Sequence, residues 1–184
     1  HPLKGYRARK GDGIVFSHRE GWKDRPMEVA CGQCRGCRLE QRRQWALRIG
    51  HEASLHEENC FLTLTYDRAH LPADRSLDRR VMPAFMKRLR KANTYRDESG
   101  KLVRKLIRYY GVGEYGDNGR PHYHLCVFGH DPADKSVLTR VGGHQVYLAE
   151  TIAKAWQHRG MHQVGTLTAQ SARYVAGYVQ KKVK

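Results

Sequence analysis

The sequence has few acidic residues and no long apolar run. Asp and Glu number 18 against 34 Lys and Arg, which gives a formal net charge of +16. Such an excess attracts phosphate backbones by counterion release, so it favours nucleic acid as a partner over an anionic membrane or a merely soluble basic surface. No stretch approaches the ~18 consecutive apolar residues of a membrane helix, and the first residues lack the apolar core of a signal peptide. We therefore expect a cytoplasmic protein without a membrane partner.

The cysteines are too few, and odd in number, for a disulfide framework. There are five, at positions 31, 34, 37, 60 and 126, which indicates thiols in a reducing compartment. Cys31, Cys34 and Cys37 have the repeated three-residue spacing of a zinc site, with Cys60 or a histidine as the fourth ligand. Buried free thiols are the alternative and the favoured interpretation.

Repeats and low-complexity linkers are also missing, and a 184-residue chain that is 40% hydrophobic fits one domain over residues 1–184. It begins at His1, so we expect a trimmed piece of a longer protein. Apolar periodicity predicts helices at 35–55, 78–91, 149–159 and 170–183, and strands at 61–66, 106–114, 122–128 and 163–168. Residues 1–30 are expected to be an irregular arm with one strand near 13–16, and a loop with Gly142 and Gly143 is expected after residue 128. This order predicts an α+β fold, a sheet layered against helices.

Two histidines alternate in the predicted strand 122–128. Alternation puts His122 and His124 on one face and the apolar residues on the other. A hairpin that turns about Asn118 places Glu114 opposite His122. Two imidazoles and one carboxylate leave positions open for a phosphate oxygen, which favours Mg or Mn in use, although Zn, Co or Ni would bind more tightly and could occupy the site in crystals. The alternative is that both histidines are solvent-facing or merely hydrogen-bonded.

Two tyrosines lie four residues apart in the predicted C-terminal helix. Tyr174 and Tyr178 fall off its valine stripe and beside Lys181, with Lys182 as a second candidate cation. A tyrosine that attacks a DNA phosphodiester forms a covalent phosphotyrosine and retains the bond energy for rejoining. A phenol has a pKa of about 10, so it needs help from a metal and a lysine. Packing of both rings is the alternative.

The triplet His122-Tyr123-His124 with the downstream tyrosine pair resembles the HUH endonucleases, in particular the replication initiation proteins of microviruses. The similarity runs from the segment 31–38 through 61–66 to 174–182. It implies an RRM-like antiparallel sheet of about five strands with flanking helices. It also implies His122, His124 and Glu114 as metal ligands and both tyrosines as nucleophiles. Tyr178-Val179-Gln180-Lys181 matches the Tyr-x-x-Lys of one-tyrosine relatives, whereas Gly177 stands at the lysine position that follows Tyr174.

The resemblance further implies the activity: nicking and rejoining of single-stranded DNA at a hairpin or loop origin in rolling-circle replication. A phage protein of this kind would act in the host bacterial cytoplasm, where a host helicase or polymerase is a further expected partner. The competing hypothesis is a non-catalytic, basic DNA-binding module with a structural metal. The residues expected to contact the DNA backbone are Arg42, Arg43, Lys87, Arg88 and Lys182.

Overall fold

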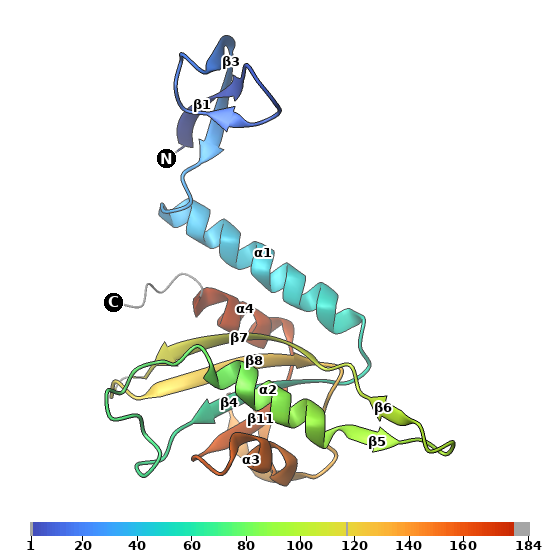
Figure 1. Cartoon of the computed structure of the whole chain (residues 1–184). Coiled ribbons are helices and arrows are strands. Elements are labelled where there is room, and N and C mark those ends of the chain that lie inside the picture. Colours follow the sequence, from blue (N-terminus) through green and yellow to red (C-terminus); the bar gives the residue numbers. More distant parts are fainter. Residues whose placement is uncertain (1, 117, 179–184) are drawn as a thin grey trace. The chain divides into compact units, whose positions relative to one another are not determined.

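The computed structural model describes residues 2–116 and 118–178 of the chain (Figure 1). Contacts gather in two compact units, His1–Arg43 and Gln44–Lys184, and each is described by itself. A single nuclease domain over residues 1–184 stays a prediction. No helix in the described ranges is long and apolar enough to cross a membrane.

The first unit contains a small antiparallel sheet in the order β2-β1-β3. Its strands are β1 (Pro2–Ala8), β2 (Ile14–Val15) and β3 (Gly21–Ala30). The expectation of an irregular arm was therefore wrong, except for the strand at β2. Most side chains of β1 and β3 are exposed, so these strands lack the alternation of apolar and polar residues by which a half-buried strand is recognised.

The second unit is built on a six-stranded sheet in the order β7-β8-β4-β11-β10-β9, with every neighbouring pair antiparallel. The strands are β4 (Asn59–Thr65), β7 (Arg108–Tyr115), β8 (Pro121–Phe128), β9 (Lys135–Val141), β10 (His144–Ala149) and β11 (His162–Thr166). The α+β fold is confirmed, with six strands where about five were expected.

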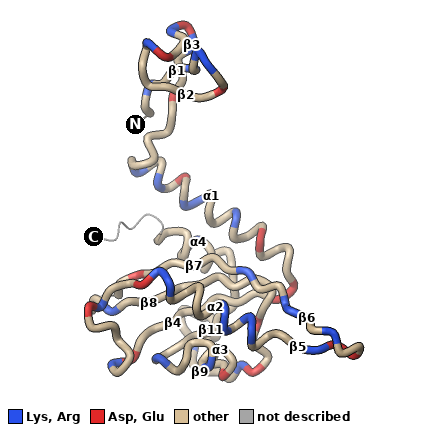
Figure 2. The backbone as a smooth tube through the Cα atoms, viewed as in Figure 1, with Lys and Arg blue, Asp and Glu red and all other residues tan. Residues whose placement is uncertain are grey.

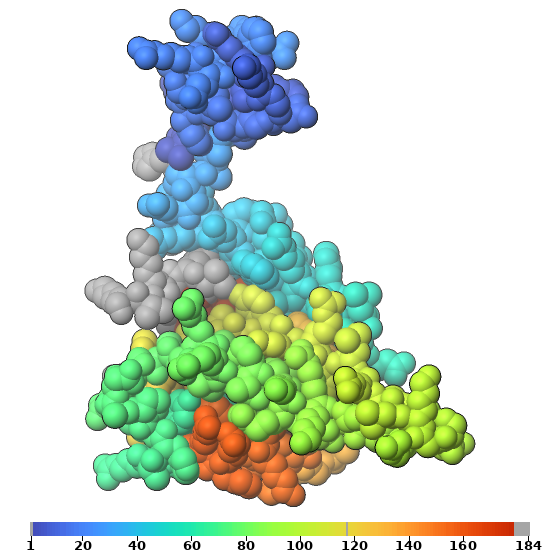
Figure 3. All heavy atoms as spheres, in the orientation of Figure 1, coloured from blue at the N-terminus to red at the C-terminus, as the bar shows by residue number. Residues whose placement is uncertain are grey.

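Helices cover both faces of this sheet (Figure 1). On one face, α2 (Val81–Ala92) and α3 (Glu150–Trp156) bury the alternate residues of β4 and β8 in the main core, with Trp156 and Phe85 fully buried. Figure 3 shows α2, in green, lying against α3, in orange. On the other face, α4 (Ala169–Tyr178) packs with the part of α1 (Arg35–Ser54) that follows Arg43. That second face carries the histidines.

Two hairpins and one helix start differ from the expectation. The loop expected after residue 128 contains β9 and β10, joined at Gly142 and Gly143, whose φ angles of 56° and 81° suit a tight hairpin turn. The turn at residues 97–100 is flanked by the short strands β5 (Thr94–Arg96) and β6 (Leu102–Arg104). Helix α2 begins at Val81 without a side-chain cap. Asp78, where the helix was expected to begin, instead accepts hydrogen bonds from the backbone N–H and the guanidinium of Arg80.

Candidate active site

The β7–β8 hairpin sets the positions of the histidines and the carboxylate. Glu114 pairs directly with His122, as a hairpin turning about Asn118 predicted. The turn closes through Gly116 N–H donating to the carbonyl of Arg120 at 3.0 Å. Tyr123, between the histidines, is buried in the main core, so both imidazoles belong to the opposite face of the sheet.

His124 is held by contacts from both neighbouring strands. The residue is buried, with 5% of its surface exposed. Nδ1 lies 3.1 Å from the hydroxyl of Thr63 on β4, and Nε2 lies 3.2 Å from the carboxylate of Glu114 on β7. The carboxylate thus reaches the diagonal neighbour, His124, although its directly paired residue is His122. Two donors bound at about 2.1 Å to one octahedral ion lie about 3 Å apart, so the Glu114–His124 spacing fits a shared metal ion.

His122 completes the expected ligand set only in part. Its Nδ1 is buried and has no hydrogen-bond partner among the described residues, which suits a nitrogen awaiting a ligand. A Cβ built on Gly116 would lie 2.4 Å from its Nε2, so the ring packs against the hairpin turn. In the described ranges, one set of three His, Cys, Asp or Glu donors lies within 4.8 Å of one another, and it consists of cysteines. The His122 ring must therefore turn to join Glu114 and His124 around one ion.

Helix α4 presents both tyrosines to His124. The Tyr174 ring centroid lies 5.5 Å from that of His124 in an edge-on arrangement, and the Tyr178 centroid lies 5.7 Å from it, nearly stacked. The two phenol rings are 4.9 Å apart. The helix start is fixed by Thr168 and Ser171, whose hydroxyls each accept a hydrogen bond from the other's backbone N–H. The expected neighbours Lys181 and Lys182 lie outside the described residues.

The two phenols have different surroundings. Tyr174 is 45% exposed, whereas Tyr178 is partly buried. Burial raises the pKa of Tyr178, and hydrogen bonds with Tyr174 and Glu114 raise it further. An added cation would oppose this effect, because it stabilises the phenolate relative to the phenol.

Two residues of this face were missed from the sequence. Phe61 stacks on the His124 ring with centroids 5.9 Å apart and an interplanar angle of 5°. Its edge also meets Tyr174 at 6.4 Å. Thr63 is the hydrogen-bond partner of Nδ1. The alternation of residues 61–66 separates Phe61 and Thr63 from the core residues, but only the pairing of β4 with β8 brings them to His124.

The cysteines divide into two kinds. Cys31, Cys34 and Cys37 are free thiols, as expected, but they are half-buried and not fully buried. Among the described residues they form the one set of three close metal donors, and whether they bind a metal stays a prediction. Cys60 and Cys126 are fully buried in the two hydrophobic clusters of the second unit. Burial raises the pKa of the Cys126 thiol to about 12 and also raises that of Cys60. Cys60 is therefore a core residue and not a member of the cysteine set.

The expected DNA-contacting cations have unequal exposure. Figure 2 shows Lys and Arg in blue along α1 and on α2. Arg42 and Lys87 are exposed, and Arg43 pairs with Glu40 at 3.0 Å. Arg88 instead donates from Nε to the carbonyl of Ala155 at 2.6 Å, and burial lowers its pKa. Arg88 thus ties α2 to α3. Lys182 lies outside the described residues.

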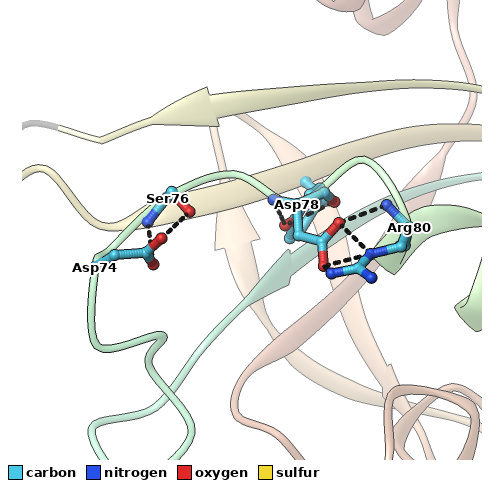
Figure 4. A network of polar contacts seen from close by, with 5 residues as sticks. Asp74, Ser76, Asp78 and Arg80 are labelled. Atoms are coloured by element: carbon cyan, nitrogen blue, oxygen red, sulfur yellow. Dashed lines mark hydrogen bonds and ion pairs between the residues drawn. The ribbon is translucent and has the colours of Figure 1, made fainter.

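A cleft of about 630 Å³ opens between the β4–α2 loop and Arg159. Figure 4 shows two short-range networks in that loop: Asp74 accepts hydrogen bonds from Ser76, and Asp78 accepts them from Arg80. The loop is anchored to the sheet, because Tyr115 and Tyr123 accept hydrogen bonds from the backbone N–H groups of residues 77 and 78. No sequence motif indicated this cleft.

The fold and the site together define an α+β protein with a histidine- and tyrosine-lined site on one face of an antiparallel sheet. Residues 59–183 match the family described as replication-associated protein ORF2/G2P, and the chain belongs to this family. No solved structure matches the chain.

Three curated relatives are phage proteins. The replication-associated protein VP4 of Bdellovibrio phage phiMH2K is 39% identical over 187 residues, covering 99% of this chain and 57% of that protein. The replication-associated protein ORF2 of Spiroplasma virus 4 is 32% identical, covering 99% and 60%. The replication-associated protein ORF4 of Chlamydia phage 1 is 36% identical over 160 residues, covering 84% and 38%. The chain thus spans about three-fifths of the length of the first two.

Proposed function

We propose that this chain is the nuclease part of a phage rolling-circle replication initiator, which nicks and rejoins single-stranded origin DNA. The observation that carries the proposal is the position of His124. It contacts the Glu114 carboxylate at 3.2 Å and lies under both phenol rings of α4 at 5.5 and 5.7 Å. A cation held by Glu114 and His124 would therefore lie on the same face of the sheet as both phenols, where one phosphodiester could be bound beside both.

The nicking step is a displacement at phosphorus. The phenol oxygen of Tyr174 or Tyr178 attacks the phosphorus. A bond forms between this oxygen and the phosphorus, which stays on the 5′ end of the cut strand, and the P–O3′ bond breaks. The phenol proton leaves the tyrosine, and a proton reaches the departing 3′ oxygen to give a free hydroxyl. In the reverse step, a 3′ hydroxyl attacks the phosphotyrosine and releases the phenol.

Residues of the sheet supply the metal site. His124 and Glu114, joined by His122 after its ring turns, would hold a divalent cation, and the oxygen-rich substrate favours Mg or Mn. A bound cation would polarise the phosphate oxygens and lower the resistance to attack. Lys181 remains a candidate cation for the developing charge.

Two tyrosines on one helix turn permit a two-cleavage cycle. One phenol would carry the DNA while the other makes the second cut, so both phenol oxygens must be able to reach a phosphodiester bound beside His124. Their ring separation of 4.9 Å is compatible with transfer of the DNA from one tyrosine to the other.

The test is covalent capture of DNA. The protein is incubated with circular single-stranded phage DNA and Mn²⁺, and a DNA adduct that survives boiling in detergent is expected. The variant His122→Ala/His124→Ala should lose the adduct, whereas His144→Ala, at an exposed position on β10, should keep it. Retained DNA binding with no adduct in the unaltered protein would favour the non-catalytic binding module instead.

A further inference from the structure

Three cysteines join β3 to α1 within the first unit. Cys31 directly follows β3, Cys34 precedes the helix, and Cys37 lies in its first turn. Their sulfur atoms all lie within 4.8 Å of one another, and Sγ of Cys31 is 3.9 Å from Sγ of Cys37. The nicking chemistry proposed above uses none of them.

The local backbone prepares these sulfurs to carry negative charge. The N–H of Cys34 donates to Sγ of Cys31 at 3.3 Å, and the N–H of Cys37 donates to Sγ of Cys34 at 3.5 Å. Both amides belong to the start of α1, where the helix dipole also favours an anion. The thiolate is the form that binds a metal.

The spacing of the sulfurs matches a tetrahedral thiolate site. Zn–S bonds of about 2.3 Å in a tetrahedron place two sulfurs about 3.8 Å apart, close to the 3.9 Å between Cys31 and Cys37. Hard cations such as Mg and Mn prefer oxygen ligands, whereas thiolates favour zinc. The cysteine set therefore differs in metal preference from the Glu114–His124 pair.

The first unit also lacks the usual source of stability. Among its described residues, 2–43, none is a buried hydrophobic side chain. Units of about 40 residues seldom fold on a hydrophobic core alone and rely on disulfides, metals or association. No disulfide is formed by the cysteines here.

We propose that Cys31, Cys34 and Cys37 bind one zinc-type cation that fastens β3 to the start of α1 and stabilises the first unit. Three thiolates come from this set, and the fourth position is taken by a water molecule or another nitrogen or oxygen donor. Binding of the metal then contributes directly to the folding of residues 2–43.

The main experiment measures metal content on the full chain, independently of nicking. About one tightly bound zinc per chain is expected after dialysis, and it should remain in His122→Ala/His124→Ala, which separates it from the proposed catalytic metal. The variant Cys31→Ser/Cys34→Ser/Cys37→Ser should lose it, whereas Cys126→Ala, a buried thiol of the other unit, should keep it. Zinc retained by the triple variant would overturn the proposal.

A second measurement avoids any concern that the triple variant fails to fold. X-ray absorption of the unaltered zinc protein should show three sulfur neighbours and one nitrogen or oxygen neighbour, and cobalt substitution should give thiolate charge-transfer bands. Chelation should expose residues 2–43 to protease before the rest of the chain. Zinc coordination without sulfur ligands would refute the site. So would a disulfide between two of these cysteines in the purified protein.

Discussion

Thr63 and His124 face each other across the β4–β8 pair, and the Thr63 hydroxyl lies 3.1 Å from Nδ1 of the imidazole. Nε2 is thereby directed to Glu114, at 3.2 Å. Metal-binding histidines usually use the second ring nitrogen in this way, because the hydrogen bond fixes both the tautomer and the ring orientation. Thr63 is therefore a positioning residue for the proposed metal site.

Replacing this hydroxyl should weaken metal binding without unfolding the sheet. Thr63→Val keeps the shape of the side chain and removes the hydrogen bond, so we expect Mn²⁺ affinity at the histidine site to fall by about 10–100-fold. Calorimetric titration of Mn²⁺ measures the change. Thr63→Ser should retain most of the affinity. Equal affinity in the valine variant would mean that the hydroxyl does not orient the ring.

Gly116 offers a way to displace His122 without replacing it. A Cβ at this position would lie 2.4 Å from Nε2 of the ring, so Gly116→Ala must shift the ring or the turn. A shift of the turn would misplace His122 relative to Glu114 and His124. Because a misplacement of about 1 Å costs catalysis about 100-fold, we expect a loss of up to that order in adduct formation. Gly50→Ala is the control, because its Cβ meets nothing within 4 Å. Full activity of Gly116→Ala would show that the position of this turn does not limit adduct formation.

The sequence predicts the histidine strand well because its signals are local. Alternation alone separates His122 and His124 from the core, and a short hairpin pairs Glu114 with His122, as found. The arrangement of all three ligands around one ion cannot be read from such local patterns. It depends on ring orientations, and these leave His122 turned toward Gly116 and not toward Glu114 and His124.

Other features depend on contacts between distant segments. Thr63 meets His124 across 61 positions in the sequence, so no short motif could name it as a partner. The strands β3 and β9 escaped prediction because most of their side chains are exposed, and exposed strands lack the apolar alternation that marks a half-buried one. The turn glycines of residues 142 and 143 were visible in the sequence, but they were assigned to a loop.

Lys87 and Arg88 are neighbours on α2, but the structure gives them different roles. Lys87 is exposed, so Lys87→Ala should weaken binding of single-stranded DNA uniformly and reduce the salt-dependence slope by up to about one. Arg88 donates to the carbonyl of Ala155, so Arg88→Ala should lower Tm and leave the slope unchanged. Fluorescence anisotropy over a salt series and thermal melting measure both. A lower Tm for Lys87→Ala and a smaller salt-dependence slope for Arg88→Ala would contradict these roles.

Two buried histidines predict acid sensitivity of the fold. His162 accepts a hydrogen bond from the N–H of Ala149 on Nε2, and burial lowers its pKa below the ordinary 6.5. Burial likewise lowers the pKa of His130. The unfolded chain therefore binds more protons than the folded chain below pH about 6.5, so stability should fall as the pH drops from there toward the folded-state pKa, and stay level above pH about 7.5.

Urea unfolding at a series of pH values measures this decline. His162→Gln keeps a hydrogen-bonding side chain without a titrating ring, so its stability should fall less steeply between pH about 7 and 5.5. The exposed His144→Ala should follow the unaltered protein. An identical decline in all three proteins would show that His162 does not titrate with folding.

The tyrosine pair supports the most specific prediction on the proposed cleavage. Tyr174 is the more exposed phenol, while the pKa of Tyr178 is raised by burial and by its hydrogen bonds with Tyr174 and Glu114. Each of Tyr174→Phe and Tyr178→Phe keeps the ring packing on His124, so each should reduce or redirect adduct formation while the fold is kept. The double variant should form no adduct, and mass spectrometry of the single variants should find the DNA on the remaining tyrosine. Tyr147→Phe, on β10, is the control and should form the adduct normally. An adduct that persists in the double variant would place the nucleophile elsewhere, because these are the only two phenols that the structure brings against the His124 ring within the described residues.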